Sequence, residues 1–253
     1  GSDLVIQRFD LHTHTYYSDG EGSVQDSVDK GVERGLALLA VTDHFDEPLP
    51  HRISKEQLEE LIEIVKGKAY PIPVLLGVET GIEGAVPPLL EKDVDLIIRS
   101  VHYLRKPVKA VSPYDPSYWE AYKNEVLDLL QKPGDVAGHI EGYLPLPLGD
   151  MKTTFDERRA MEREIAEKYF DREWQEAVAK TAAQNRIAIE IHSFTKTPRI
   201  DFIRLCQQYG CLFSVGSDAH PTENIGKIDW AFEVIEDLKI PKEQLLPYAK
   251  GWL

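Results

Sequence analysis

The sequence predicts an α/β barrel built from about seven strand–helix units. Apolar runs alternate along the chain with segments of helical periodicity, and no linker divides the 253 residues. Runs such as residues 36–41 and 74–78 are almost continuously apolar, as in parallel strands that are buried on both faces. A histidine, glutamate or aspartate lies at or near the end of each run, and a closed ring lets all these ends converge. An open sheet would instead gather its chemistry at one switch point.

The expected strands span residues 5–12, 37–44, 74–79, 96–102, 135–140, 187–192 and 211–217. Four intervening helices begin with a capping box, in which a serine or threonine is followed three residues later by an acid or amide. These pairs are Ser23/Asp26, Ser54/Gln57, Ser117/Glu120 and Thr154/Glu157. The stretch 154–185 is long and rich in charge, which indicates a solvated amphipathic helix or a pair of helices.

Bulk composition limits the class of protein. We expect one barrel domain over residues 3–253, with Gly1 and Ser2 left over from expression. We recognise no signal peptide and no run near the ~20 apolar residues of a membrane span, which predicts a cytoplasmic protein. The net charge of −14 argues against a broad nucleic-acid-binding surface. Cys206 and Cys211 are expected to be buried free thiols.

Seven of the eight histidines lie at or just past the end of an expected strand. They are His12, His14, His44, His102, His139, His192 and His220. The eighth, His51, lies in a polar loop and is expected to be incidental. Because histidine is the most common metal ligand and parallel barrels gather their chemistry at the carboxyl ends of the strands, this placement predicts one metal-dependent active site.

Local spacing supports a metal site. His12 and His14 flank a single residue, so an extended chain points both imidazoles to the same side. The same spacing of ligand residues recurs at positions 190–192 and 218–220. Imidazoles and carboxylates without thiolates suit zinc, manganese or iron. So many buried imidazoles would be costly without cations, and three ions could be held if one carboxylate bridges.

The order of these motifs resembles the polymerase and histidinol phosphatase (PHP) superfamily of metal-dependent phosphoesterases. The matching motifs are His-Thr-His at 12–14, Ser-Asp-Gly at 18–20, Thr-Asp-His at 42–44, Gly-Val-Glu at 77–79, Ser-Val-His at 100–102, Gly-His at 138–139 and Gly-Ser-Asp-Ala-His at 216–220. They cover almost the whole chain, and the first and last motifs are specific in combination.

This resemblance implies a distorted seven-stranded, TIM-like (β/α)7 barrel with its metal site at the carboxyl ends of the strands. It also implies three divalent ions, which would be zinc, manganese or iron. The implied ligands are, for the first ion, His12, His14, Glu79 and Asp218, for the second Asp19, His44 and His220, and for the third His102 and His139 with Glu79 as a bridge.

Further residues near these motifs are candidates for contact with substrate. Asp218 or His220 could pass a proton to the leaving group. Arg199 and Arg105 are candidates for binding phosphate oxygens, since a guanidinium binds them in two-point contact. Many relatives have Glu-x-Asn where this chain has His192, which could contact substrate, orient a ligand or replace the amide. Four tyrosines could wall the pocket or pack at the rim: Tyr16, Tyr17, Tyr103 and Tyr143.

The resemblance predicts hydrolysis of a small phosphate monoester by a metal-bound hydroxide, as in histidinol phosphatases. The stand-alone barrel, the motif at 216–220, the long helical region and the acidic surface favour this branch. Two other enzyme classes stay open, a phosphodiesterase or nuclease of the same superfamily and an amidohydrolase-like hydrolase. An interaction module without catalysis is disfavoured because every matched ligand position is filled. The sequence predicts no oligomeric state.

Overall fold

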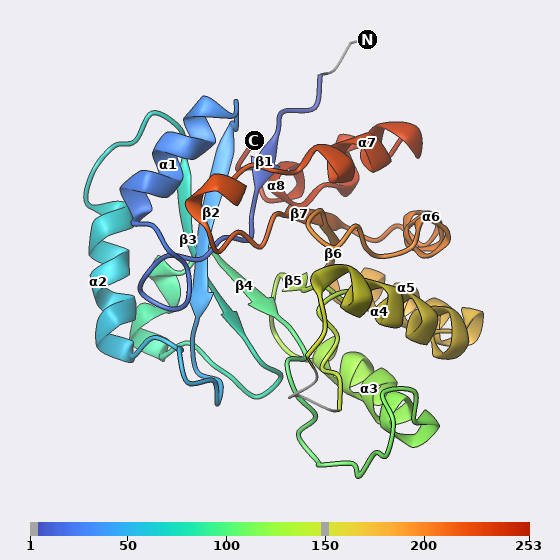
Figure 1. The fold of residues 1–253 in the computed structure, drawn as a ribbon. Coiled ribbons are helices and arrows are strands. Elements are labelled where there is room, and N and C mark those ends of the chain that lie inside the picture. The colour runs from blue at the N-terminus through green and yellow to red at the C-terminus, as the bar shows by residue number, and fades with distance from the viewer. Residues whose placement is uncertain (1–4, 148–151) are drawn as a thin grey trace.

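The computed structural model describes residues 5–147 and 152–253 (Figure 1). Its seven strands form one sheet in chain order, and every neighbouring pair is parallel. The strands are β1 (Phe9–Asp10), β2 (Leu38–His44), β3 (Val74–Thr80), β4 (Leu96–Arg99), β5 (Val136–Ala137), β6 (Ala188–His192) and β7 (Phe213–Gly216). The expected expression remnant, Gly1 and Ser2, lies outside the described residues.

Backbone hydrogen bonds between the first and last strands close the sheet into a barrel. The Leu11 amide donates to the Val215 carbonyl at 2.9 Å, and the Asp218 amide donates to the His12 carbonyl at 2.8 Å. The predicted seven-stranded, TIM-like barrel is therefore confirmed, and the open sheet is excluded. The closure also brings the first and last ligand motifs side by side.

Helices cover the outside of the barrel, with α1 and α2 on one side and α3 to α7 on the other (Figure 1). The helices are α1 (Val24–Glu33), α2 (Lys55–Lys66), α3 (Pro116–Leu129), α4 (Phe155–Tyr169), α5 (Arg172–Asn185), α6 (Ile200–Gln208), α7 (Asp229–Asp237) and α8 (Leu246–Ala249). Short 3₁₀ helices occupy Pro88–Asp93, Thr222–Asn224 and Lys242–Gln244.

Strands β1 and β5 are two residues long, shorter than the sequence indicates. The chain turns at the end of β5 because His139 has a φ of 26°, which is incompatible with continued regular pairing. Beyond β1 the chain keeps contact with both neighbours, since Thr13 pairs with Ala219 and its carbonyl accepts from the Thr42 amide. The departures from regular strand geometry thus coincide with the ligand motifs.

Three of the four predicted capping boxes are present, those of Ser23, Ser54 and Thr154. The box predicted at Ser117 is wrong. Helix α3 begins at Pro116, and Asp115 caps it by accepting the Ser117 amide at 3.0 Å. Proline fits the first helical position because it needs no amide hydrogen bond there, so the residue before it becomes the cap.

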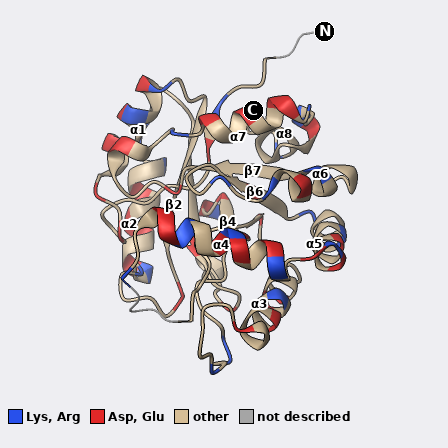
Figure 2. Cartoon of the chain, turned by 45° about the vertical axis from the view of Figure 1, so that its right-hand side comes forward, with Lys and Arg blue, Asp and Glu red and all other residues tan. Residues whose placement is uncertain are grey.

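The charged stretch 154–185 forms a pair of helices, α4 and α5, with Asp171 capping the second. Figure 2 shows acidic and basic residues of α4 in alternation on the side facing the viewer. Two charged residues of α4 nevertheless point inward, because Arg159 and Glu162 are buried. The expectation of a solvated helix pair therefore holds for most of its charges but not for these two.

The core is apolar and lies between the barrel and its helices. Every residue of β2 is buried, as expected for a strand with helices on one side and the barrel interior on the other. Cys206 and Cys211 are buried free thiols, as predicted. Among the helices of the described ranges, none combines the length and apolar character needed to cross a membrane.

The observed cap of α3 gives a test of the fold. We expect Asp115→Ala to lower the melting temperature by about 2–4 °C, because an orphan backbone donor loses its acceptor. Ser117→Ala should lower it less, since Ser117 is not the capping residue. Thermal unfolding of both variants, followed by circular dichroism, measures the difference. A larger loss for Ser117→Ala would contradict the observed helix start.

Candidate metal centre

The predicted metal ligands meet at the carboxyl end of the barrel, around a cavity of about 440 Å³. Seven of them line the cavity: Asp19, His44, Glu79, His102, His139, Asp218 and His220. The remaining two, His12 and His14, lie deeper and are fully buried. Leu49, His51 and Tyr143 complete the lining. The strand ends thus converge as the barrel geometry requires.

The carboxylate of Glu79, at the end of β3, occupies the centre of the cluster. Its Oε1 lies 3.1 Å from Nε2 of His12, 3.2 Å from Nε2 of His14 and 3.6 Å from Nδ1 of His44. Its Oε2 lies 3.3 Å from Nε2 of His102 and 3.3 Å from Nε2 of His139. Each oxygen therefore faces a different set of imidazoles, which is the arrangement a bridging carboxylate needs.

A second carboxylate, Asp19, stands at the mouth of the cavity. Its Oδ2 lies 3.1 Å from Nε2 of His220, 3.4 Å from Nε2 of His44 and 3.2 Å from Nε2 of His51. Its loop is held by Asp43, which accepts hydrogen bonds from the amide and hydroxyl of Thr15, both at 2.8 Å. Asp43 therefore fixes the loop that carries Asp19. His51, expected to be incidental, lies within the cluster instead.

The described residues contain three sets of potential ligands, and within each set all ligand atoms lie within 4.8 Å of one another. The sets are His12, His14, Glu79 and Asp218; His14, Asp19, His44 and His220; and His44, Glu79 and His102. The first two contain the ligands that the resemblance implies for two ions, with His14 shared between them. The third set contains His44 and His102. His139 is not a member of it, but its Nε2 lies 3.3 Å from Glu79 Oε2, the oxygen that His102 also approaches.

Unpartnered buried nitrogens test whether the cluster suits metal ions. His12 Nε2, His14 Nδ1 and His44 Nδ1 are buried and make no hydrogen bond, although carboxylate oxygens lie 3.1 to 3.6 Å from them. Buried polar atoms are nearly always hydrogen-bonded, so these nitrogens call for a partner of another kind. Imidazole nitrogens and carboxylate oxygens are the donors that zinc, manganese and iron accept. The residues present therefore fit divalent cations.

Charge leads to the same conclusion. Burial disfavours a protonated imidazole, yet hydrogen bonds to Asp19 and Glu47 raise the pKa of His44 to about 11. Burial is likewise outweighed at His102, where Glu79 and Glu47 raise the pKa to about 10. Burial alone would raise the pKa of the Glu79 carboxyl, but the imidazoles hold it well below its usual range. The carboxylates stay ionised and attract positive charge, for which metal ions and protons compete.

His192 positions Asp218 rather than facing the cavity. Its Nδ1 accepts from the Thr195 amide at 3.3 Å and contacts the Thr195 hydroxyl at 2.7 Å. The proton therefore resides on Nε2, which donates to Asp218 Oδ2 at 3.0 Å. His192 is completely buried, and of the three roles considered for it we propose that it orients Asp218, a candidate ligand.

Helix α4 braces this arrangement from outside. Arg159 donates twice to the Thr195 carbonyl, at 3.0 and 2.7 Å, and forms a buried ion pair with Glu162. Glu162 in turn accepts the Leu144 amide. Leu144 follows Tyr143, which lines the cavity. The two inward-pointing charges of α4 thus fix the loops after β5 and β6 together.

Two further carboxylates fix imidazole orientation. Glu190 Oε2 lies 2.6 Å from His12 Nδ1, and its Oε1 accepts the His139 amide at 2.8 Å. Glu47 Oε1 lies 2.6 Å from His102 Nδ1, so Nε2 of His102 is left to face the cluster. The sequence analysis noted the spacing of Glu190 but missed Glu47. Its only signal is its position three residues after His44.

The two arginines proposed to bind phosphate lie elsewhere. Arg199 donates to the buried carboxylate of Glu141 at 2.8 Å and to the Phe170 carbonyl at 2.9 Å. Arg105 donates to Glu125 at 2.8 Å and to Asp128 at 2.6 Å, and pairs with Glu83. Neither lines the cavity, because carboxylates distant in sequence hold both side chains. Of the four tyrosines considered, Tyr143 lines it.

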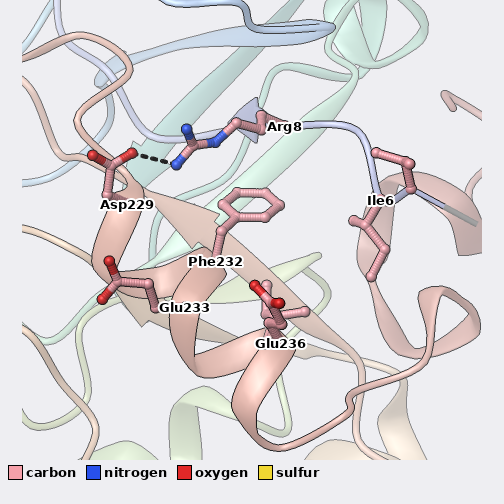
Figure 3. A pocket seen from close by; sticks show the side chains of 8 residues that line it. Ile6, Arg8, Asp229, Phe232, Glu233 and Glu236 are labelled. Atoms are coloured by element: carbon pink, nitrogen blue, oxygen red, sulfur yellow. Dashed lines mark hydrogen bonds and ion pairs between the residues drawn. The ribbon is translucent and has the colours of Figure 1, made fainter.

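A cavity larger than the one at the ligand cluster, of about 690 Å³, lies beside the start of β1 and helix α7 (Figure 3). Arg8 there pairs with Asp229, and its guanidinium stands 5.5 Å from the centre of the Phe232 ring. The described residues that line it include no histidine and no member of the three ligand sets. Size alone therefore does not mark the site.

The barrel and its cluster of imidazole and carboxylate ligands define a metal-dependent hydrolase. The model of the PHP domain matches residues 10–193. The chain belongs to the PHP domain family, and it is an enzyme of the metal-dependent phosphoesterase class. The resemblance seen in the sequence motifs is thereby confirmed.

Individual relatives match this chain over most of their length. A probable phosphatase of Caldicellulosiruptor saccharolyticus is 25% identical over 250 residues, covering 94% of this chain and 90% of that protein. A probable phosphatase of Vibrio vulnificus is 26% identical over 261 residues, covering 96% and 89%. The histidinol phosphate phosphatase of Lactococcus lactis, solved with zinc, L-histidinol and phosphate, has a TM-score of 0.63 at 18% identity, covering 93% and 95%. This structural likeness establishes the fold.

The buried Glu47–His102 contact leads to a prediction about metal affinity. We expect Glu47→Gln to weaken zinc binding by about 10- to 100-fold, because a carboxylate that orients a ligand imidazole also raises its basicity. Competition with a chromogenic chelator measures the affinity. Glu56→Gln, on the exposed side of α2, is the matched control. Unchanged affinity in Glu47→Gln would show that His102 needs no such support.

Proposed function

We propose that the protein hydrolyses a small phosphate monoester, with L-histidinol phosphate as the leading candidate, and that it uses three divalent ions. The observation that carries this proposal is the shared carboxylate of Glu79, whose two oxygens face different imidazoles at the cavity. Adjacent ligand sets of this kind suit the clamping of a phosphoryl group between cations.

The proposed ligands follow the strand ends, with His12, His14, Glu79 and Asp218 holding one ion, Asp19, His44 and His220 the second, and Glu79, His102 and His139 the third. When bound, divalent ions supply Lewis acidity, which activates water as a nucleophile and offsets the charge of the phosphoryl group. Zinc, manganese and iron all match the donor set.

Asp218 and His220 are the residues that we propose for transfer of a proton to the leaving group. His220 Nδ1 donates to the Asp218 carbonyl oxygen at 2.8 Å, so its Nε2 faces the cavity beside Asp19. The His220 side chain is 32% exposed, whereas that of Asp218 is 3% exposed and accepts from His192. His220 is therefore the more accessible of the two, and it could pass a proton through Nε2 only while that nitrogen holds no ion.

The cavity favours a small monoester over a nucleic acid. Within the described part of the chain, no lysine or arginine lines it, and a groove that tracks a nucleic-acid backbone needs such cations. The Lactococcus lactis neighbour was solved with L-histidinol and phosphate, which makes histidinol phosphate the first substrate to test.

Metal removal and reconstitution test this proposal. We expect chelator-treated protein to lose phosphatase activity and zinc or manganese to restore it, since water activation depends on the cation. The assay compares L-histidinol phosphate, an aryl phosphate monoester and the matching diester. Preference for the diester would favour a phosphodiesterase instead. No turnover of any of the three by metal-loaded protein would contradict the proposed substrate class.

A single substitution tests the role of the central carboxylate. We expect Glu79→Gln to lower kcat by more than about 100-fold, because it removes a bridge between ligand sets that stabilise transition-state charge. Glu91→Gln, on the short helix after β3, is the control and should keep full activity. Metal content measured on the same samples must fall in Glu79→Gln. A variant with full metal content and full activity would exclude the bridging role.

A further inference from the structure

We infer that His51 and Tyr143 bind the phosphoryl oxygens of the substrate, the role that the sequence analysis gave to Arg199 and Arg105. This inference rests on the proposed function. Both arginines are engaged by buried or clustered carboxylates away from the cavity. Phosphoryl oxygens that no metal ion contacts must therefore be bound by other hydrogen-bond donors.

The cavity lining leaves few choices. Seven of its ten residues are proposed metal ligands, and Leu49 has an apolar side chain. His51 and Tyr143 are the two that remain, and each carries a hydrogen-bond donor. They also lie over different parts of the cluster, His51 beside Asp19 and Tyr143 beside His139. A ligand in the cavity would thus meet one donor from each side.

His51 is held in place by the loop after β2. The residue two positions later, Ile53, is buried, and its amide donates to the His44 carbonyl at 2.8 Å. The imidazole of His51 lies edge-to-face with that of His44, at 4.8 Å between ring centres. Its side chain is 35% exposed, so it reaches the open mouth of the cavity as well as the ligand set. It is therefore both fixed and accessible.

Tyr143 is held in an unusual conformation. Its φ of 47° lies in the left-handed region, which a tyrosine rarely adopts unless its surroundings impose it. The next residue, Leu144, is fixed by Glu162 of α4. The ring stands edge-on to those of His139 and His192, at 5.7 and 5.2 Å. Across the described residues no hydrogen bond engages its hydroxyl group, so this donor is free for a ligand.

Neutral donors suit this site better than a guanidinium. The metal ions already supply positive charge, so an imidazole N–H and a phenol O–H orient the oxygens without adding to it. A hydrogen bond to a charged oxygen contributes enough free energy for its loss to weaken binding by about 10- to 100-fold. Each of the two side chains should therefore contribute measurably to the affinity for phosphate.

Inorganic phosphate binding to the zinc-loaded protein tests the inference directly. We expect His51→Ala and Tyr143→Phe each to weaken phosphate binding by about 10- to 100-fold, with bound zinc unchanged. Calorimetry gives the phosphate affinity, and elemental analysis gives the zinc content. Tyr16→Phe is the matched control, because Tyr16 is exposed and lies outside the cavity. Tyr143→Phe removes only the hydroxyl and should keep the fold, which circular dichroism checks.

Each outcome decides the inference separately from the proposed function. Phosphate affinity within twofold of the wild type in both variants would overturn it. Loss of zinc in His51→Ala would overturn the assignment of His51 and make it a metal ligand. Wild-type protein that binds zinc and phosphate yet hydrolyses no monoester would contradict the proposed function, while the phosphate affinities of the variants would still decide the inference.

Discussion

Five imidazoles lie within 3.6 Å of the Glu79 carboxylate, which is itself buried. Such a cluster is stable only when its charges balance, and much of the surrounding structure serves that balance. The strands must end at one level for the imidazoles to meet. Glu47 and Glu190 must then turn individual rings so that the correct nitrogen faces inward. The barrel can be understood as the scaffold that this buried charge requires.

Support also comes from outside the barrel. Arg159 and Glu162 of α4 are buried in a helix whose other charges are mostly solvated, and their hydrogen bonds go to the loops after β5 and β6. Through Thr195 and His192 this support reaches Asp218, and through Leu144 it reaches Tyr143. Helix α4 is thus connected by hydrogen bonds to a candidate ligand, Asp218, and to the wall of the cavity. Substitution of Arg159 or Glu162 should therefore disturb the positions of Asp218 and Tyr143.

The fold and the convergence of the candidate ligand residues could be predicted, because the strand ends of a parallel barrel meet at one edge whatever the connecting loops do. Other features depend on contacts that sequence spacing does not encode. His51 and Glu47 lie in an aperiodic loop, and Arg199 is taken by Glu141, 58 positions away. The cap of α3 is Asp115 and not the predicted Ser117, because Pro116 can occupy the first position of a helix. Local sequence patterns therefore predicted the barrel and the residues at its strand ends. The positions of loop residues and the pairing of the arginines depend on partners distant in sequence.

Closure of the barrel has a consequence for the order in which the candidate ligand sets can form during synthesis. Two of the three ligand sets include Asp218 or His220, whereas their other members lie in the first third of the chain. A ribosome-bound chain that lacks β7 can assemble only the set of His44, Glu79 and His102. Contacts of such long sequence separation form late in folding. Completion of all three candidate ligand sets therefore requires that the last strand has joined the first.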